Sequence, residues 1–410
     1  MGKTPQYNKP YVKLAYKIVR WYFANLVKRK FNYKTVETTP LSAINGPSLI
    51  VANHITFHDY RFIMGSMDTQ MSFVASENLM CRGMLSRIIR LSDRIIPVFK
   101  PNVATGTTME MVRRLRAGHT VCIWPEGRLC PDGVSMHMKK GCGALAKLAK
   151  CNLVTFRIRG AFFADPNWGN DRKRQGPISG EIVAVYTPEQ LAKMSNEEVE
   201  AIIARDLFED AYARQLQDMH VYKGEKLAES LEKFYHVCPN CKAFKSIYSQ
   251  GDDFYCRECG MHGKFDQYGM ISGEKLPYTT LPPWRQMERK VLADYIDSMP
   301  DDAVLFEDEV MMQETCPEER RIKDIRRGRF WADKKGIYFE DEVAAEFAKL
   351  PWMDYEWRGR ALQVLYKGRH LQFSSDTFVA DQYLTLFFHM RPDLFNSPRV
   401  EGSLERRTEI

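Results

Sequence analysis

Two short apolar runs, each followed directly by polar residues, constrain the fold of this chain more than any other feature. Residues 48–52 and residues 121–124 have the length and the hydrophobic composition of buried β-strands. The first run is followed by Asn53-His54-Ile55-Thr56-Phe57-His58-Asp59, and the second by Pro125-Glu126-Gly127-Arg128. The sequence therefore predicts that both polar groups lie where a buried strand ends.

The residue types at these two positions point to proton transfer and anion binding. A histidine with an aspartate five positions later can form a pair in which Asp59 holds one ring nitrogen of His54 protonated. The other ring nitrogen is then free to accept a proton from a substrate hydroxyl. In the second segment, Gly127 allows close approach of the backbone, Arg128 can bind phosphate, and backbone N–H groups around Glu126 and Gly127 could stabilise an oxyanion.

Other interpretations of these residues exist. His54 could be a structural histidine, as we expect His58 to be, and Arg128 could be a surface cation or a partner of Glu126. His54 and His58 lie four positions apart beside Asp59, which on a helix could begin a metal site. That interpretation lacks a third block of ligands and leaves residues 125–128 unexplained.

The order of the segments resembles the glycerophospholipid acyltransferase family, whose members include the 1-acylglycerol-3-phosphate (lysophosphatidic acid) acyltransferases. The resemblance covers roughly residues 35–220 and lies in several ordered blocks. Asn53-His54 with Asp59 matches the first block of the family, and the apolar strand from Arg94 to Lys100 resembles the second. The remaining matches are Trp124 to Arg128 with the Phe-Pro-Glu-Gly-x-Arg block, Lys139 and Gly141 with the Phe-Lys-x-Gly block, and residues 153–158 with the last strand.

Two positions depart from the family pattern. Arg128 follows Gly127 directly, whereas one residue usually separates them, which leaves the head group of the acceptor open. Arg157 and Arg159 stand in the last block, where the family usually carries a proline. Extra positive charge at this strand would favour an anionic acceptor or a phosphorylated donor.

The resemblance implies an enzyme of phospholipid biosynthesis that moves a fatty acyl group to the hydroxyl of a lysophospholipid, with 1-acylglycerol-3-phosphate as the first candidate. The donor would be a thioester, either acyl-CoA or acyl carrier protein. The resemblance assigns catalysis to His54, Asp59, Glu126 and Gly127, and phosphate binding to Lys100, Arg128 and Lys139. The rival hypothesis is a membrane- or nucleic-acid-binding adaptor that has no catalytic activity.

Residues 1–34 carry a candidate membrane-interface helix. The apolar stretch at residues 11–27 is interrupted by Lys13, Lys17 and Arg20, so it does not meet the criterion for a membrane span, and we expect no signal peptide. At helical spacing these cations share one face, and apolar and aromatic residues cover the rest. Such a helix suits an anionic lipid surface, although it could equally pack on the catalytic domain.

The net charge of +7 is compatible with work beside anionic phospholipid. Charge alone would fit nucleic acid equally well, but the acyltransferase resemblance gives us no reason to expect nucleic acid as a partner. We therefore expect a cytoplasmic protein that lies peripherally on the inner face of the membrane.

A second motif consists of two Cys-x2-Cys pairs, Cys238 with Cys241 and Cys256 with Cys259, separated by fourteen residues. Four thiolates at this spacing predict a zinc ribbon with a closed, structural metal site. Disulfides are the alternative, but a chain that stays in a reducing compartment favours zinc.

The domain organisation that follows is an α/β acyltransferase domain with a mixed sheet at residues 35–230, a zinc ribbon at 231–275, a linker at 276–300, a β-rich domain at 301–400 and a tail at 401–410. Within residues 301–400, successive short strands with turn signals precede one helix. Antiparallel strands capped by a C-terminal helix resemble lipid-binding domains of the PH and GRAM type, which would add a second membrane contact or a partner contact.

Overall fold

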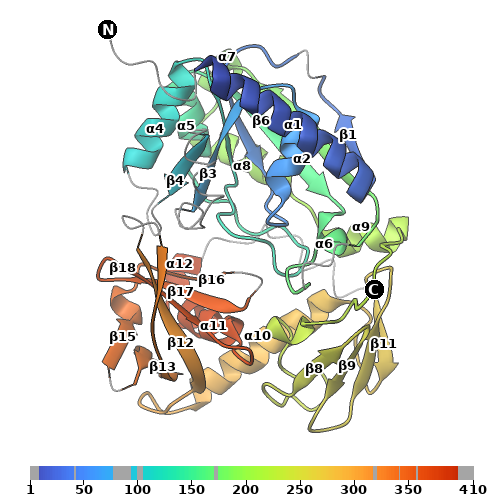
Figure 1. The fold of residues 1–410 in the computed structure, drawn as a ribbon, viewed down its shortest axis with the longest axis vertical. Coiled ribbons are helices and arrows are strands. Elements are labelled where there is room, and N and C mark those ends of the chain that lie inside the picture. Colours follow the sequence, from blue (N-terminus) through green and yellow to red (C-terminus); the bar gives the residue numbers. More distant parts are fainter. Residues whose placement is uncertain are drawn as a thin grey trace. The chain divides into compact units, whose positions relative to one another are not determined.

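The computed structural model describes residues 9–40, 43–76, 94–98, 105–169, 174–316, 321–340, 342–356 and 359–395. It divides into two compact units (Figure 1). The first is formed by Met1–Ala164 and Arg174–Tyr222, and the second by Lys223–Asn396 with the short segment Asp165–Lys173. The predicted tail at 401–410 and the phosphate-binding candidate Lys100 lie outside the described residues.

The first unit is built on a seven-stranded mixed sheet with the order β1-β7-β6-β2-β5-β3-β4. The pair β6–β7 is antiparallel and the other neighbours are parallel. The central strand β2 is buried at every residue, as expected for a parallel strand that is covered on both faces. The strands are β1 (Tyr33–Glu37), β2 (Ser48–Ala52), β3 (Met71–Ser76), β4 (Ile95–Val98), β5 (Thr120–Ile123), β6 (Asn152–Arg159) and β7 (Ile178–Tyr186).

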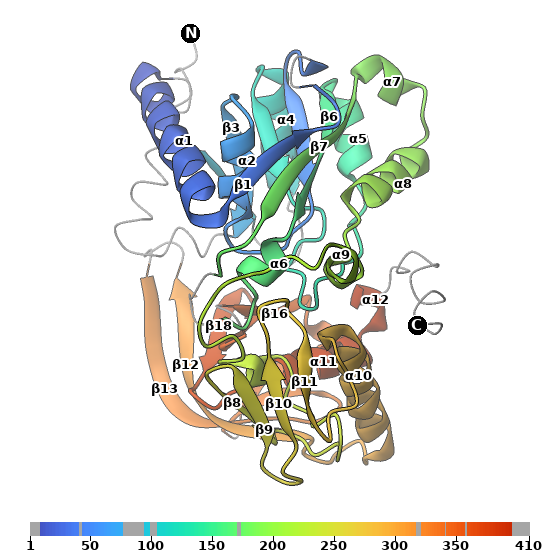
Figure 2. The same ribbon diagram turned by 90° about the vertical axis from the view of Figure 1, so that its right-hand side faces the viewer.

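Helices cover both faces of this sheet (Figure 2). α1 (Pro10–Phe31) packs against α2 (Asp59–Ser66), which contacts β6 and β7. The opposite face carries α4 (Thr105–Arg116), α5 (Cys142–Ala149), α7 (Pro188–Ala192) and α8 (Asn196–Leu207), whose apolar residues share one core with β2, β5 and β6. The short helices α6 (Ala161–Ala164) and α9 (Ala211–Asp218) complete the unit. This is the α/β architecture with a mixed sheet that the sequence predicts.

The second unit contains two antiparallel sheets. The smaller is β11-β10-β9-β8, made of β8 (Ile247–Gln250), β9 (Asp253–Cys256), β10 (His262–Phe265) and β11 (Ile271–Glu274), and it carries the four cysteines at its β8–β9 end. The larger has the order β15-β14-β13-β12-β18-β17-β16 and is followed by α11 (Ala380–Met390) and α12 (Pro392–Phe395). Its strands are β12 (Phe306–Cys316), β13 (Arg321–Ala332), β14 (Gly336–Phe339), β15 (Glu342–Glu346), β16 (Trp352–Glu356), β17 (Ala361–Tyr366) and β18 (Arg369–Ser374).

The predicted linker at residues 276–300 is wrong. The segment contains the helix α10 (Leu281–Ser298), which contacts α11. Trp284 and Leu292 are completely buried, and Leu292 and Ile296 belong to the same core as the larger sheet. Two charged residues of α10, Arg285 and Glu288, are buried as partners in an ion-pair cluster.

The helix α1 occupies the segment for which a membrane-interface helix was predicted. Val12, Tyr16, Val27 and Phe31 are buried, so part of the helix packs on the α/β unit. A second set of apolar side chains remains exposed, namely Tyr11, Leu14, Ile18, Val19, Trp21 and Tyr22. Among the described residues, no helix has both the length and the apolar character needed to cross a bilayer.

Candidate active site

The structure brings His54 and Asp59 together at the carboxyl end of β2. His54 lies two residues beyond the strand, and Asp59 is the first residue of α2. The Nδ1 atom of His54 lies 2.9 Å from Oδ2 of Asp59. Because the carboxylate can only accept, Nδ1 carries the proton in the neutral ring, and Nε2 is left as the basic nitrogen.

Asp59 is held by the loop that separates it from His54. Its Oδ2 also accepts the backbone N–H of Ile55 at 2.7 Å, and its Oδ1 accepts both the backbone N–H and the hydroxyl of Thr56 at 3.0 Å. The Asp59 side chain is 1% exposed, whereas that of His54 is 22% exposed. The Asp59 carboxylate is therefore held in place by hydrogen bonds and shielded from solvent, while the His54 ring stays accessible to a substrate.

Asn53 anchors this loop to the sheet. Its Nδ2 donates to the carbonyl of Ile158 at 2.9 Å, and its Oδ1 accepts the N–H of Ile158 at 2.7 Å. This pair extends the contact between β2 and β6 by one residue beyond the last register pair, Ala52 with Phe156. The sequence placed Asn53 in a motif without giving it a role, and the structure gives it this positioning contact.

Glu126 hydrogen-bonds the backbone of His54. One carboxylate oxygen accepts the backbone N–H of His54 at 2.7 Å, and the other accepts the backbone N–H of Met136 at 2.7 Å. Burial raises the pKa of Glu126 to about 8, against the lowering effect of these two hydrogen bonds and with a further raising effect of the Asp59 charge. Its contacts are those of a residue that positions the backbone of His54.

Further backbone contacts join the segment after β5 to His54 and close it on itself. The N–H of Cys130 donates to the carbonyl of His54 at 2.8 Å, and the N–H of Lys139 donates to the carbonyl of Pro125 at 2.9 Å. Cys130 is itself buried, and burial raises the pKa of its thiol well above the ordinary value, which disfavours a nucleophilic thiolate. The adjacent parallel strands β2 and β5 thus end in one interconnected group of residues.

The side chain of Lys139 lies against the turn at Gly127. Gly127 has a φ of 70°, and a Cβ atom built at this position would lie 2.8 Å from Nζ of Lys139. The Lys139 ammonium group therefore lies directly against the Gly127 backbone. Of the other two predicted phosphate ligands, Arg128 follows Gly127 in the sequence and Lys100 lies outside the described residues.

The Gly127 N–H is engaged within the turn. It donates to the carbonyl of Trp124 at 3.0 Å and closes a tight turn. A donor that is engaged in this way cannot also stabilise an oxyanion without opening of the turn. Oxyanion binding by this N–H group therefore requires the turn to open, and the assignment of backbone N–H groups around Glu126 and Gly127 to an oxyanion stays a prediction.

The surplus positive charge expected from Arg157 and Arg159 is also neutralised. Arg157 pairs with Glu181 at 2.8 Å, and Arg159 lies 3.3 Å from Glu181 and 3.4 Å from Glu209. These carboxylates lie on β7 and after α8, which the sequence did not connect with the β6 arginines. The two arginines therefore act as ion-pair partners within the unit.

The imidazole of His54 is part of an aromatic stack that the sequence did not reveal. The rings of His54 and Trp124 are stacked, with centroids 5.0 Å apart and an interplanar angle of 23°. Phe73 of β3 stacks on Trp124, with a centroid distance of 5.9 Å and an angle of 18°. The only signal in the sequence was the aromatic residue directly after the β5 run.

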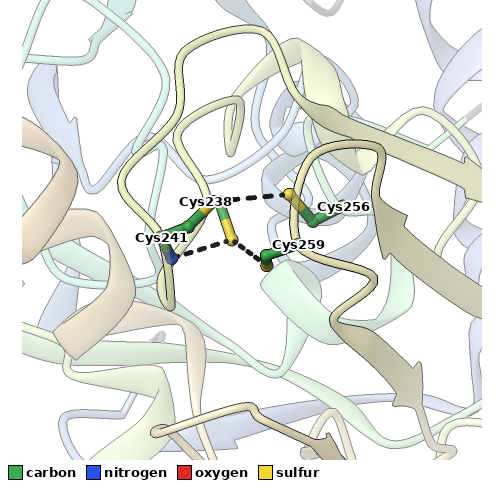
Figure 3. Close-up of side chains that lie close together, drawn as sticks. All are labelled: Cys238, Cys241, Cys256 and Cys259. Carbon is green, nitrogen blue, oxygen red and sulfur yellow. Dashed lines mark hydrogen bonds between the residues drawn. The ribbon is translucent and has the colours of Figure 1, made fainter.

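Two groups of described residues could offer metal ligands, and His54 belongs to neither. One is the set of four cysteines in Figure 3. The sulfur atoms of Cys238 and Cys259 lie 3.7 Å apart, as do those of Cys241 and Cys256. A tetrahedral zinc ion with bonds of about 2.3 Å places its sulfurs about 3.8 Å apart, and a disulfide would place them at about 2 Å. The cluster is therefore compatible with a zinc ribbon.

The second group, His236, Glu288 and Asp381, already contains a cation of the protein. The guanidinium of Arg285 binds Glu288 at 2.8 Å and both carboxylate oxygens of Asp381. The remaining oxygen of Glu288 accepts the backbone N–H groups of His236 and Val237. The group is a buried ion-pair cluster that joins α10 and α11 to the residues just before Cys238.

Comparison with known proteins finds one family model that matches part of the chain. Residues 30–159 match the family model described as Acyltransferase. None of the curated proteins matches the chain. One similar solved structure is the 1-acyl-sn-glycerophosphate (LPA) acyltransferase PlsC from Thermotoga maritima, with 21% sequence identity, coverage of 52% of this chain and 85% of that chain, and a TM-score of 0.40. The residues matched by the family model include the His54–Asp59 pair and the turn after β5, so this part of the chain is similar to the acyltransferase family.

Proposed function

We propose that the chain transfers a fatty acyl group from acyl-CoA or acyl carrier protein to the hydroxyl of a lysophospholipid, with 1-acylglycerol-3-phosphate as the preferred acceptor. The observation that carries this proposal is the 2.9 Å contact between Nδ1 of His54 and the buried carboxylate of Asp59. This contact leaves Nε2 as a base that is oriented before the substrate arrives.

The reaction needs no covalent acyl-enzyme. Nε2 of His54 takes the proton of the acceptor hydroxyl as its oxygen attacks the carbonyl carbon of the thioester. Asp59 stabilises the imidazolium that forms and keeps the ring in place. Collapse of the tetrahedral intermediate breaks the carbon–sulfur bond, and the imidazolium returns its proton to the leaving thiolate. An ester and a free thiol are the products.

The phosphate of the acceptor would be bound by Arg128 and Lys139, together with Lys100. Support for this proposal comes from Lys139, whose ammonium group lies against Gly127, the residue between Arg128 and the Glu126 that bonds the backbone of His54. A phosphate held there fixes the acceptor at one end, which converts a bimolecular attack into an oriented one. A guanidinium and an ammonium group are suited to a phosphate monoester, which carries nearly two charges at neutral pH.

We further propose that α1 docks the domain peripherally on an anionic membrane. Its exposed side chains include Leu14, Ile18 and Trp21, each more than half exposed, and the helix ends in Lys28, Arg29 and Lys30. Apolar and aromatic groups beside a cluster of cations are the composition of an interfacial helix. Trp21→Glu should weaken sedimentation with vesicles that contain phosphatidylglycerol. Leu148→Glu, at an exposed leucine of α5, is the matched control and should leave sedimentation unchanged.

The four cysteines are proposed to hold one structural zinc ion. Cys238, Cys241, Cys256 and Cys259 would supply four thiolates and leave no open coordination position, so the metal would contribute folding energy and take no part in acyl transfer. The Asn240 amide is the main cause that lowers the pKa of the Cys259 thiol to about 6, which favours the thiolate that zinc requires.

The test is a matrix of substrates offered to the purified, zinc-replete protein. Lysophosphatidic acid, lysophosphatidylcholine and lysophosphatidylglycerol are each combined with acyl-CoA or acyl carrier protein, and the diacyl product is identified by mass spectrometry. We expect product with lysophosphatidic acid, and none from the His54→Ala variant. Turnover only with another lysophospholipid would overturn the acceptor assignment. An absence of product from every pair, while the protein still binds anionic vesicles, would favour the adaptor hypothesis.

A further inference from the structure

We infer that Trp124 is a positioning residue that stabilises the protonated form of His54 through the face of its indole ring. The inference rests on the proposed function, because it assigns a partner to the imidazolium that forms during acyl transfer. It concerns a residue that the family resemblance places at a phenylalanine position and to which the pattern alone gives no role.

The geometry is that of a ring stack. The indole and imidazole centroids lie 5.0 Å apart and the planes differ by 23°, so the face of Trp124 is presented to His54. An indole face carries negative charge density and attracts a cation within about 6 Å of the ring centroid, more strongly than a phenylalanine face does. Since His54 is neutral before proton transfer and positive after it, this attraction is stronger once the proton has moved.

The indole is held in this position by a second aromatic ring. Phe73 of β3 stacks on Trp124 with a centroid distance of 5.9 Å and an interplanar angle of 18°. The Trp124 Nε1 atom is buried and has no hydrogen-bond partner among the described residues. A buried indole N–H usually has such a partner, so ring packing between His54 and Phe73, rather than a polar contact, orients this side chain.

The other charged and titratable groups that hydrogen-bond His54 come from two parts of the chain and remain in place when Trp124 is changed. They are Asp59 on α2, which bonds the ring at Nδ1, and Glu126 and Cys130 on the segment after β5, which bond the backbone of His54. Asp59 bonds the imidazole edge at Nδ1, whereas Trp124 lies against its face. The two contacts are therefore independent, and removal of one leaves the other.

Two variants of Trp124 distinguish the effect of its aromatic face from the effect of its apolar volume. Trp124→Phe keeps an aromatic face without the indole N–H, and Trp124→Leu keeps an apolar side chain without an aromatic face. Phe73→Leu tests the support of the indole, because it removes the ring that stacks on Trp124 and leaves the indole itself in the chain. The readouts are the pH profile of kcat/KM and the pH titration of the His54 Cε1–H NMR signal in the substrate-free protein, with thermal unfolding to verify that each variant folds.

For Trp124→Leu we expect the midpoint of the His54 titration and the acid limb of the pH profile to move down by about half a unit to one unit. The kcat value should fall by about threefold to tenfold. The midpoints of Trp124→Phe and Phe73→Leu should both fall between those of the wild type and Trp124→Leu, because the first keeps a weaker aromatic face and the second removes the ring that supports the indole. An unchanged midpoint in folded Trp124→Leu, whether or not activity falls, would overturn the inference. Because the NMR titration needs no turnover, it tests the inference even if the wild type has no acyltransferase activity.

Discussion

The carboxylate of Glu126 accepts the backbone N–H of His54 at 2.7 Å, across 72 positions of sequence. The two residues follow the neighbouring parallel strands β2 and β5. The same carboxylate also accepts the N–H of Met136, so one buried side chain ties the histidine loop to the segment that carries Arg128 and Lys139. The proposed base and the proposed phosphate ligands are thus positioned by a shared partner.

Glu126→Gln should lower both stability and activity. Both oxygens of Glu126 can accept a hydrogen bond even when the acid is protonated, whereas the amide presents an NH2 group, which accepts none, to one of the two backbone N–H groups. A buried donor that loses its acceptor costs about 1–3 kcal/mol. The free energy of unfolding in urea and the kcat/KM for acyl transfer measure the two effects. Glu189→Gln, at an exposed carboxylate of α7, is the control and should match the wild type in both. Wild-type values for Glu126→Gln would contradict the positioning role.

The raised pKa of Glu126 gives stability a definite pH dependence. The pKa lies at about 8 in the folded chain against an ordinary value of 4.5. Between these values the folded state binds a proton that the unfolded state has lost, so the contribution of Glu126 to the free energy of unfolding falls as the pH rises. The free energy of unfolding of Glu126→Gln, relative to that of the wild type, should therefore increase progressively from pH 5 to pH 8. Urea unfolding of both proteins at pH 5, 6.5 and 8 tests this, and a constant difference would contradict it.

Asp381→Asn should destabilise the second unit by about 3–5 kcal/mol, because it leaves the buried Arg285 charge without its two-bond partner. The control is Asp297→Asn, which removes an exposed pair with His389 and should cost less than about 1 kcal/mol. Thermal unfolding of each variant supplies the comparison. Equal losses in the two variants would contradict a structural role for the buried cluster.

The same cluster predicts loss of stability in acid. Burial by itself would raise the pKa of Asp381, but the positive charge of Arg285 outweighs it and holds the pKa well below the ordinary 3.8. The pair therefore contributes its full stabilisation above about pH 4, and the contribution is lost as the pH falls below that value. The wild type should lose more stability than Asp381→Asn when unfolding is followed from pH 5 to pH 3. Parallel losses would show that Asp381 does not contribute.

Zinc removal should unfold the smaller sheet of the second unit. We expect one zinc ion per chain by elemental analysis, and release of it by a strong chelator should expose the buried residues next to the site, such as Val237, to hydrogen exchange. Returning zinc should restore protection. Cys256→Ser should purify with less metal and start in the exchanged state. Four cysteines that resist thiol reagents in the denatured, metal-free protein would instead indicate disulfides.

The sequence predicted the ends of β2 and β5 well, because buried parallel strands are continuous apolar runs and the polar residues that follow them stand out. His54 and Asp59 lie only five positions apart, so their pairing could be anticipated from local spacing. The four cysteines were similarly visible, since a closed metal site needs little more than two pairs of ligands at a suitable separation.

Long-range contacts could not be anticipated in the same way. Three contacts depend on strand order, which no local pattern encodes. They are the hydrogen bond between Glu126 and His54, the ion pair between Glu181 and Arg157, and the stacking of Phe73 on Trp124. The segment of helix α10 was predicted as a linker because prolines precede a charged helical stretch, and only the fold supplies the partners that allow Arg285 and Glu288 to be buried. The Gly127 N–H was assigned to an oxyanion because the sequence does not show that the turn uses it.

The most direct test of the account compares kcat/KM for His54→Ala and His58→Ala with lysophosphatidic acid and acyl-CoA. His58 is the neighbouring histidine in the same loop and has no place in the proposed mechanism. Loss of a general base predicts a fall of about 10²–10⁴-fold for His54→Ala, and His58→Ala should stay within a few-fold of the wild type. Equal activity in the two folded variants would contradict the assignment of His54 as the base.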